Sequence, residues 1–81
     1  MVTIDTDRLC GGTPNPEKLG DYLAQARDEA GVGQEVTLTG QGPAWLHLAL
    51  GHALRDRARK LIYVSPATGP VVIFDHTPLW L

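Results

Sequence analysis

A glycine loop and three histidines are the features of this 81-residue chain whose residue types suit chemistry. Gly40, Gln41, Gly42 and Pro43 follow a β-branched segment and precede a long apolar one, which is the pattern of a strand-to-helix turn. Glycines in such a turn let a ligand approach the backbone, and the helix N-terminus behind it favours phosphate. The run matches neither the dinucleotide nor the phosphate-loop signature, so spacing alone favours an ordinary tight turn.

The histidines do not form a metal pair by spacing. His47 and His52 lie five positions apart on an expected helix, about 140° around its axis, so they do not share a face. Each is either a core or interface histidine with one satisfied hydrogen bond or a candidate general base or acid. His76 follows Asp75 at the end of the last apolar segment.

The elements that position these residues follow from hydrophobic periodicity and turn residues. Asn15 and Pro16 predict a helix start, and Gly31 predicts its end. The segment 65–70 is too short for a crossover helix, so the last strand returns antiparallel. The order is strand, helix, strand, helix, strand, strand, at 2–5, 16–30, 36–39, 44–57, 61–64 and 71–74. This predicts a small Rossmann-like α/β domain with a mostly parallel sheet and an antiparallel C-terminal strand.

Strand direction then predicts where the candidate residues lie. Gly40, Gly42 and Ser65 follow parallel strands and are expected at one sheet edge, where ligands collect in α/β folds. Asp75 and His76 end the antiparallel strand and are expected at the opposite edge, unless a partner brings them over. The apolar run at 61–64 predicts a strand covered on both faces. The helix beginning at residue 44 is apolar nearly all round, which indicates a second covering layer or a partner subunit.

Composition limits the function classes. The chain is 43% hydrophobic, carries a net charge of −2 and has one cysteine, which predicts one domain over residues 1–81 in a reducing cytoplasm. No segment is apolar for long enough to span a membrane, and the acidic balance argues against binding long nucleic acids. A chain this small buries little core, which favours oligomerisation.

Charge is divided unevenly along the sequence. Residues 1–40 hold three basic and seven acidic side chains, net −4, whereas residues 41–81 hold four basic and two acidic ones, net +2. The four basic residues of the second half, Arg55, Arg57, Arg59 and Lys60, fall within six positions. They favour a solvated helix end that complements the helix dipole, with an anion-attracting edge as the alternative.

Three segments resemble one known family. The runs 39–52 (Thr-Gly-Gln-Gly-Pro-Ala-Trp-Leu-His-Leu-Ala-Leu-Gly-His), 63–66 (Tyr-Val-Ser-Pro) and 69–76 (Gly-Pro-Val-Val-Ile-Phe-Asp-His) are similar to the small ring nucleases of type III CRISPR systems. These belong to the CRISPR-associated Rossmann fold superfamily. The resemblance covers about half of the chain, and the first 35 residues match poorly.

The resemblance implies a homodimer, or a higher assembly, that binds cyclic tetra-adenylate and degrades it to linear products. Gly40, Gly42, Pro43 and Trp45 fall on the family's loop and helix start, and His52 and His76 fall on its two histidines. Gln41 and Asp75 complete the expected ligand-binding set.

Ser65 replaces the aspartate that the family associates with manganese-dependent cleavage, so no cofactor is expected here, with manganese as the family's alternative. Attack by a ribose 2′-hydroxyl on its own phosphate needs a base and no metal, and we expect His52 or His47 to supply it. Ser65 is expected to help by hydrogen bonding.

Two other functions are consistent with the sequence. A non-catalytic sponge or sensor would bind the cyclic messenger without cutting it, and the Ser65 substitution motivates that alternative. A structural interaction module would use the glycine loop as a mere turn and the apolar tail at 79–81 as an assembly contact.

Overall fold

The elements form in the order β1 (Val2–Asp5), α1 (Thr6–Leu9), η1 (Pro16–Lys18), α2 (Leu19–Ala30), β2 (Glu35–Thr39), α3 (Ala44–Ala53), β3 (Lys60–Ser65) and β4 (Gly69–Asp75). The computed structural model describes residues 1–76, and the apolar tail proposed as an assembly contact lies outside the described residues. The strands lie side by side in sequence order, parallel except for the antiparallel β3–β4 pair. The predicted α/β class, mostly parallel sheet and antiparallel last strand are confirmed.

Local sequence explains where the first long helix begins and ends. The Asn15 side chain accepts a hydrogen bond from the Glu17 N–H at 3.0 Å, and Pro16 opens the short 3-10 turn that leads into α2. Gly31 ends α2 with a φ of 66°, a conformation that favours glycine. The predicted start and end of this helix are therefore confirmed. The short helix α1 was not expected, because the segment that follows Asp7 is dominated by turn residues.

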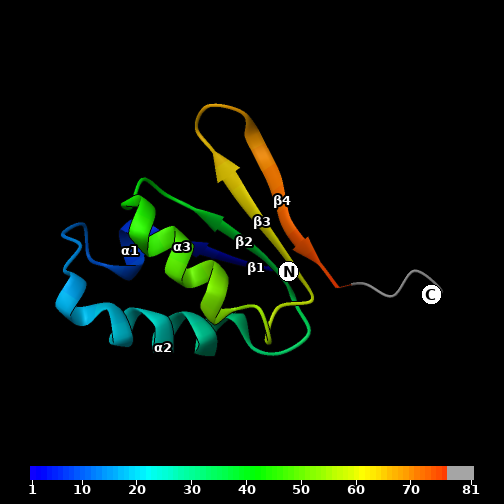
Figure 1. Cartoon of the computed structure of the whole chain (residues 1–81), viewed down its shortest axis with the longest axis horizontal. Coiled ribbons are helices and arrows are strands. Elements are labelled where there is room, and N and C mark those ends of the chain that lie inside the picture. Colours follow the sequence, from blue (N-terminus) through cyan, green and yellow to red (C-terminus); the bar gives the residue numbers. More distant parts are fainter. Residues whose placement is uncertain (77–81) are drawn as a thin grey trace.

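Both long helices lie on the same face of the sheet (Figure 1). Each parallel connection steps to the next strand in the same direction, and right-handed crossovers of that kind put their helices on one side. The side chains that point to this face, from Ile4, Val36, Leu38 and Leu61, are buried. They join residues of α2 and α3 in one hydrophobic core.

The prediction that both faces of β3 are covered is wrong. Ile62 points away from the helices and is only half-buried, and its partner Val72 on β4 is 53% exposed. Both crossovers leave the far face of the sheet without a helix among residues 1–76. The apolar run at 61–64 is therefore covered by helices on one face of the sheet only, within residues 1–76.

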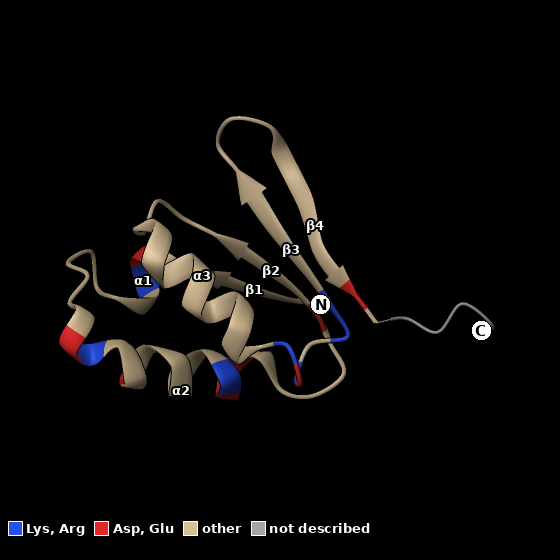
Figure 2. Cartoon of the chain, in the orientation of Figure 1, with Lys and Arg blue, Asp and Glu red and all other residues tan. Residues whose placement is uncertain are grey.

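The basic residues of the second half lie between the end of α3 and the start of β3, away from the glycine loop. Figure 2 shows these Lys and Arg residues gathered in the connection between α3 and β3. Arg55 donates to the His52 carbonyl at 2.7 Å, and Lys60 lies 3.9 Å from Glu35. The helix-end interpretation is confirmed for Arg55, whose charge meets the carbonyl end of α3. No helix within residues 1–76 is long and apolar enough to cross a membrane.

Candidate functional site

The glycine loop and the end of β3 meet at the carboxyl edge of the parallel strands, as strand direction predicts. Leu38 of β2 pairs with Tyr63 of β3, so the residues that follow both strands emerge side by side. A hollow of about 250 Å³ opens there. It is lined by Asp7, Thr39, Gly40, Gln41, Val64 and Pro66. Ser65 lies between the last two of these residues in sequence.

The backbone amides of the glycine loop are engaged within the chain. The Gln41 N–H donates to the Asp7 carboxylate at 3.1 Å, and the Gly42 N–H donates to the Thr6 hydroxyl at 3.1 Å. The same Thr6 hydroxyl donates to the Thr39 carbonyl at 3.1 Å. Amides that are already paired do not offer the open N–H cradle that phosphate binding requires.

The glycines are needed for packing against the start of α1. A Cβ at Gly40 would lie 2.5 Å from the Thr6 hydroxyl oxygen and 2.7 Å from a carboxylate oxygen of Asp5. A Cβ at Gly42 would lie 2.8 Å from the same hydroxyl. Gly40 also has a φ of 103°. The tight-turn interpretation of the loop thus has a structural cause, because only glycine lets the loop reach Thr6.

The carboxyl edge is acidic. Asp5 accepts the Asp7 N–H at 2.9 Å and caps α1, and Asp7 in turn holds the loop. No Lys or Arg lines the hollow. Carboxylates and the exposed Gln41 side chain suit ribose hydroxyls and base amines as partners, rather than phosphates.

Ser65 is committed to the hairpin between β3 and β4. Its hydroxyl oxygen accepts the Ala67 N–H at 3.1 Å and the Thr68 N–H at 3.4 Å, a local turn bond typical of serine. Among residues 1–76, no three His, Cys, Asp or Glu side chains converge in a way that could hold a metal ion. The residues present at Ser65 therefore do not fit the manganese site of the family.

The two histidines of α3 border a second, larger cavity, here named the α3–β4 groove. It has a volume of about 660 Å³ and lies between α3 and the strands β3 and β4. It is lined by Leu38, Gly42, Ala44, His47, Leu48, Gly51, His52, Leu61, Tyr63 and Ile73. Although they are about 140° apart on the helix, both histidines reach this groove because it spans a wide arc of α3.

His47 makes one hydrogen bond, as expected of a packed histidine. Its Nδ1 lies 3.3 Å from the Pro43 carbonyl oxygen, which can only accept, so Nδ1 carries the proton. The ring stands edge-on to Tyr63 with 4.9 Å between centroids. The other ring nitrogen, Nε2, is buried without a hydrogen-bond partner among the described residues.

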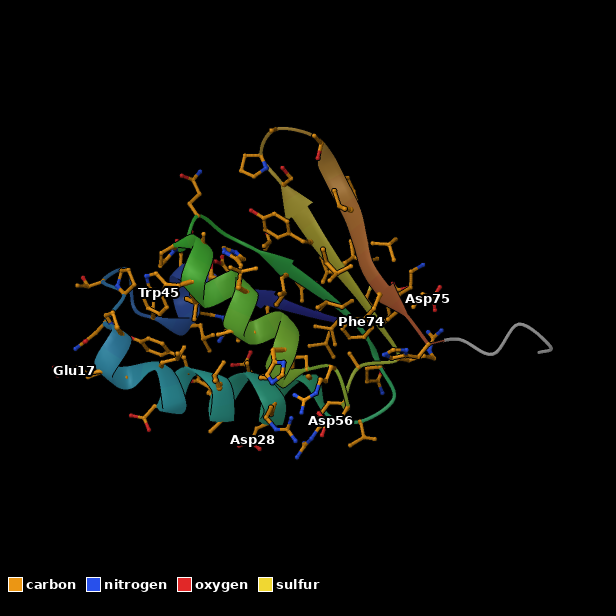
Figure 3. The ribbon with its side chains drawn as sticks, viewed as in Figure 1. Glu17, Asp28, Trp45, Asp56, Phe74 and Asp75 are labelled. Atoms are coloured by element: carbon orange, nitrogen blue, oxygen red, sulfur yellow. The ribbon has the colours of Figure 1, made fainter. Side chains whose placement is uncertain are left out.

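The remaining candidates do not line the hollow at the carboxyl edge. His52 is exposed on the last turn of α3, and the His76 N–H donates to the Arg59 carbonyl at 2.7 Å. Asp75 lies opposite Lys60, the first residue of β3, in the register of the β3–β4 pair. Asp75 and His76 therefore lie at the sheet edge opposite the glycine loop, as strand direction predicts. Figure 3 shows Trp45 on the side of α3 away from β4, where it packs against the core.

Two ion pairs tie α2 to its neighbours, and none of their four residues lines either cavity. Arg8 bonds Glu29 and holds the pKa of that carboxyl below its ordinary value. Arg27 lies 2.8 Å from Asp56 and lowers the pKa of that carboxyl too. These shifts concern the attachment of the helix and do not prepare an acid or base for catalysis.

Three residues that line the two cavities or hold the glycine loop were not among the candidates from the sequence. Thr6 and Asp7 follow β1, and the rule that ligands gather where parallel strands end could have found them. Tyr63 stands in one of the segments that carry the family resemblance, but nothing in its spacing indicated that it faces His47. Neither the scan against protein-family models nor the search of curated proteins finds a match for this chain.

Proposed function

We propose that this chain binds cyclic tetra-adenylate as a homodimer and opens the ring to linear products. The observation that carries the proposal is the meeting of the Gly40–Pro43 loop and the Ser65 turn around one hollow at the carboxyl edge of the parallel strands. These are two of the segments that resemble the ring nucleases, and the fold brings them together from positions far apart in sequence.

The polar groups at this edge support recognition of riboses and bases. The Gln41 side chain is exposed, and Asp7 presents a carboxylate beside it. A carboxylate accepts hydrogen bonds from a ribose hydroxyl or from the exocyclic amine of adenine, and repels phosphate. In this proposal the phosphates of the ring therefore point away from the hollow.

A complete site requires two copies. One hollow of about 250 Å³ is smaller than the usual pocket for a single small ligand, and the ring contains four nucleotides. A two-fold axis presents the same edge twice to a ligand that is itself symmetric. It also allows a histidine of one copy to approach the ligand held by the other, because His52 and His76 lie far from Ser65 within one chain.

The chemistry proposed is attack by a ribose 2′-hydroxyl. The 2′-oxygen bonds to the adjacent phosphorus, the bond to the 5′-oxygen breaks, and a 2′,3′-cyclic phosphate remains on the linear product. His52, which is exposed, takes the proton of the 2′-hydroxyl, and the 5′-oxygen is protonated as it leaves. His47 is the other candidate base, although its Nε2 is buried and therefore shielded from solvent.

Incubation of the protein with cyclic tetra-adenylate, followed by chromatography of the products, tests this function with manganese and with a chelator. We expect linear product in both conditions and a loss of about 10²–10⁴-fold in rate for His52→Ala, the usual effect of removing a general base. Asp28→Ala is the control, since Asp28 is exposed on α2, away from both cavities (Figure 3). Absence of binding at micromolar concentrations would contradict the proposal.

A non-catalytic sponge or sensor is the second candidate function. It is favoured by the Ser65 hydroxyl, which is already used by the Ala67 and Thr68 amides, and by the separation of the histidines from that edge. Tight binding with the ring intact after long incubation would select this candidate, and linear product would eliminate it.

A further inference from the structure

The α3–β4 groove lies beside a protruding apolar side chain. Leu48, near the middle of α3, is 75% exposed, although Leu46 and Leu50 on the same helix are fully buried. Across the groove, Ile73 on β4 is 52% exposed. The surface thus has a ridge at Leu48 and a hollow of about 660 Å³ next to it. Exposed apolar patches of this kind mark interaction sites in soluble proteins.

A register shift in the β3–β4 pair adds to this surface. Leu61 pairs with Phe74 and Ile62 pairs with Val72, so Ile73 is an extra residue between the two pairs. Such a bulge turns the extra side chain out of the normal alternation. Ile73 consequently lines the groove on the side of the helices, beside Tyr63.

The groove carries no Asp, Glu, Lys or Arg, although these types make up 20% of the chain. Its only titratable side chains are Tyr63 and the two histidines. A charged partner would find no opposite charge in the groove. A second copy of the same surface can pack against it without placing like charges opposite each other. The small residues Ala44 and Gly51 of α3 also line the groove.

We propose that the α3–β4 groove is the contact surface for a second copy of this chain. A two-fold axis makes every contact reciprocal, so it seats Leu48 of each copy in the groove of the other. The ridge and the hollow lie on one face, which is the arrangement that a reciprocal contact needs. The contact also covers the exposed Leu48 and Ile73 side chains on either side of the groove.

A dimer of this kind forms in the free protein, whether or not a nucleotide binds. The contact would bring His47, His52 and Tyr63 into the interface and leave the hollow beside Gly40 and Asp7 open, because the two cavities share no lining residue.

Sedimentation equilibrium of the free full-length chain tests the interface. We expect a mass of twice 8.8 kDa for the wild-type chain, and a dissociation constant raised about 100-fold or more by Leu48→Glu, the effect of removing an anchoring side chain and placing a charge in an apolar contact. Val32→Glu is the matched control, since Val32 is 74% exposed and does not line the groove. It should sediment as the wild type does.

A second variant, Ile73→Lys, probes the opposite wall and should also give monomers. Circular dichroism verifies that each variant keeps its fold, which the exposure of the replaced side chains predicts. A wild-type chain that stays monomeric up to about 1 mM, the weak end of specific association, would overturn the proposal and leave the groove to another molecule. A dimer that survives both variants would overturn it as well, because the interface would then lie elsewhere. Neither result depends on cyclic tetra-adenylate.

Discussion

Substitution of Gly40 by alanine separates a folding role of the glycine loop from a ligand-binding role. In the structure, a Cβ at this position lies 2.5 Å from the Thr6 hydroxyl oxygen, 2.7 Å from Asp5 Oδ1 and 2.9 Å from the Thr6 backbone nitrogen. Thr6 is fully buried, so it has no free space into which to move. Gly40→Ala should therefore destabilise the fold before it affects any ligand.

The magnitude follows from two contributions. A φ of 103° in a residue with a side chain costs about 1–3 kcal/mol. Forcing an extra methyl group into a packed site costs about 1–3 kcal/mol more. Together, the free energy of unfolding should fall by about 2–6 kcal/mol. In urea, where a domain this small loses about 1 kcal/mol of stability per molar, a loss of about 2 kcal/mol lowers the midpoint by about 2 M, and a larger loss prevents folding.

Two other glycines provide matched controls in equilibrium unfolding followed by circular dichroism. Gly33 has a φ of 76° with nothing within 4 Å of an added Cβ, so Gly33→Ala reports the backbone contribution alone. Gly20 lies within α2 with open space around it, so Gly20→Ala should stabilise the chain by up to about 1 kcal/mol. If Gly40→Ala were no more destabilising than Gly33→Ala, the packing argument for the loop would be refuted.

Two further predictions concern the same edge and the attachment of α2. Thr6→Val removes the acceptor of the Gly42 N–H and should lower the free energy of unfolding by about 1–3 kcal/mol, whereas Thr6→Ser should retain most of it in urea unfolding. Because Arg8 lowers the pKa of Glu29 in the fold, this pair stabilises above the ordinary carboxyl pKa of 4.5, and its contribution disappears as the pH falls through the lower folded-state value. Acid titration of Arg8→Gln should show a smaller loss of stability over this range than the wild type, and an equal loss would contradict the assignment.

Local sequence signals were sufficient for most of the secondary structure. Asn15, Pro16 and Gly31 act on backbone groups within a few residues of themselves, so the bounds of α2 can be read without knowledge of the rest of the chain. The short link between β3 and β4 can only return antiparallel, which is a matter of chain length. Strand direction then placed Gly40 and Ser65 at one edge and Asp75 at the other.

Sequence reasoning was weaker wherever a residue acts on a distant one. The loop glycines predict a tight turn, with ligand approach as the alternative, but they do not predict that the space they leave is filled by Thr6, a residue more than thirty positions away. The Gln41 N–H likewise donates to Asp7, which is also more than thirty positions away in the sequence. Periodicity records which positions avoid water and does not record which neighbour provides the contact.

The sequence by itself determined the class of the domain, the direction of its strands and the edge to which each candidate residue belongs, because these follow from local backbone preferences and link lengths, whereas the order of the strands across the sheet came from the structure. Only the tertiary structure decided that both helices lie on one face, since this depends on the step of each crossover across the sheet. It also decided that a bulge brings Ile73 beside Tyr63 and that Leu48 stays exposed next to them. An apolar pattern is the same whether a side chain is buried in its own chain or exposed for a partner, so the groove could be found only in three dimensions.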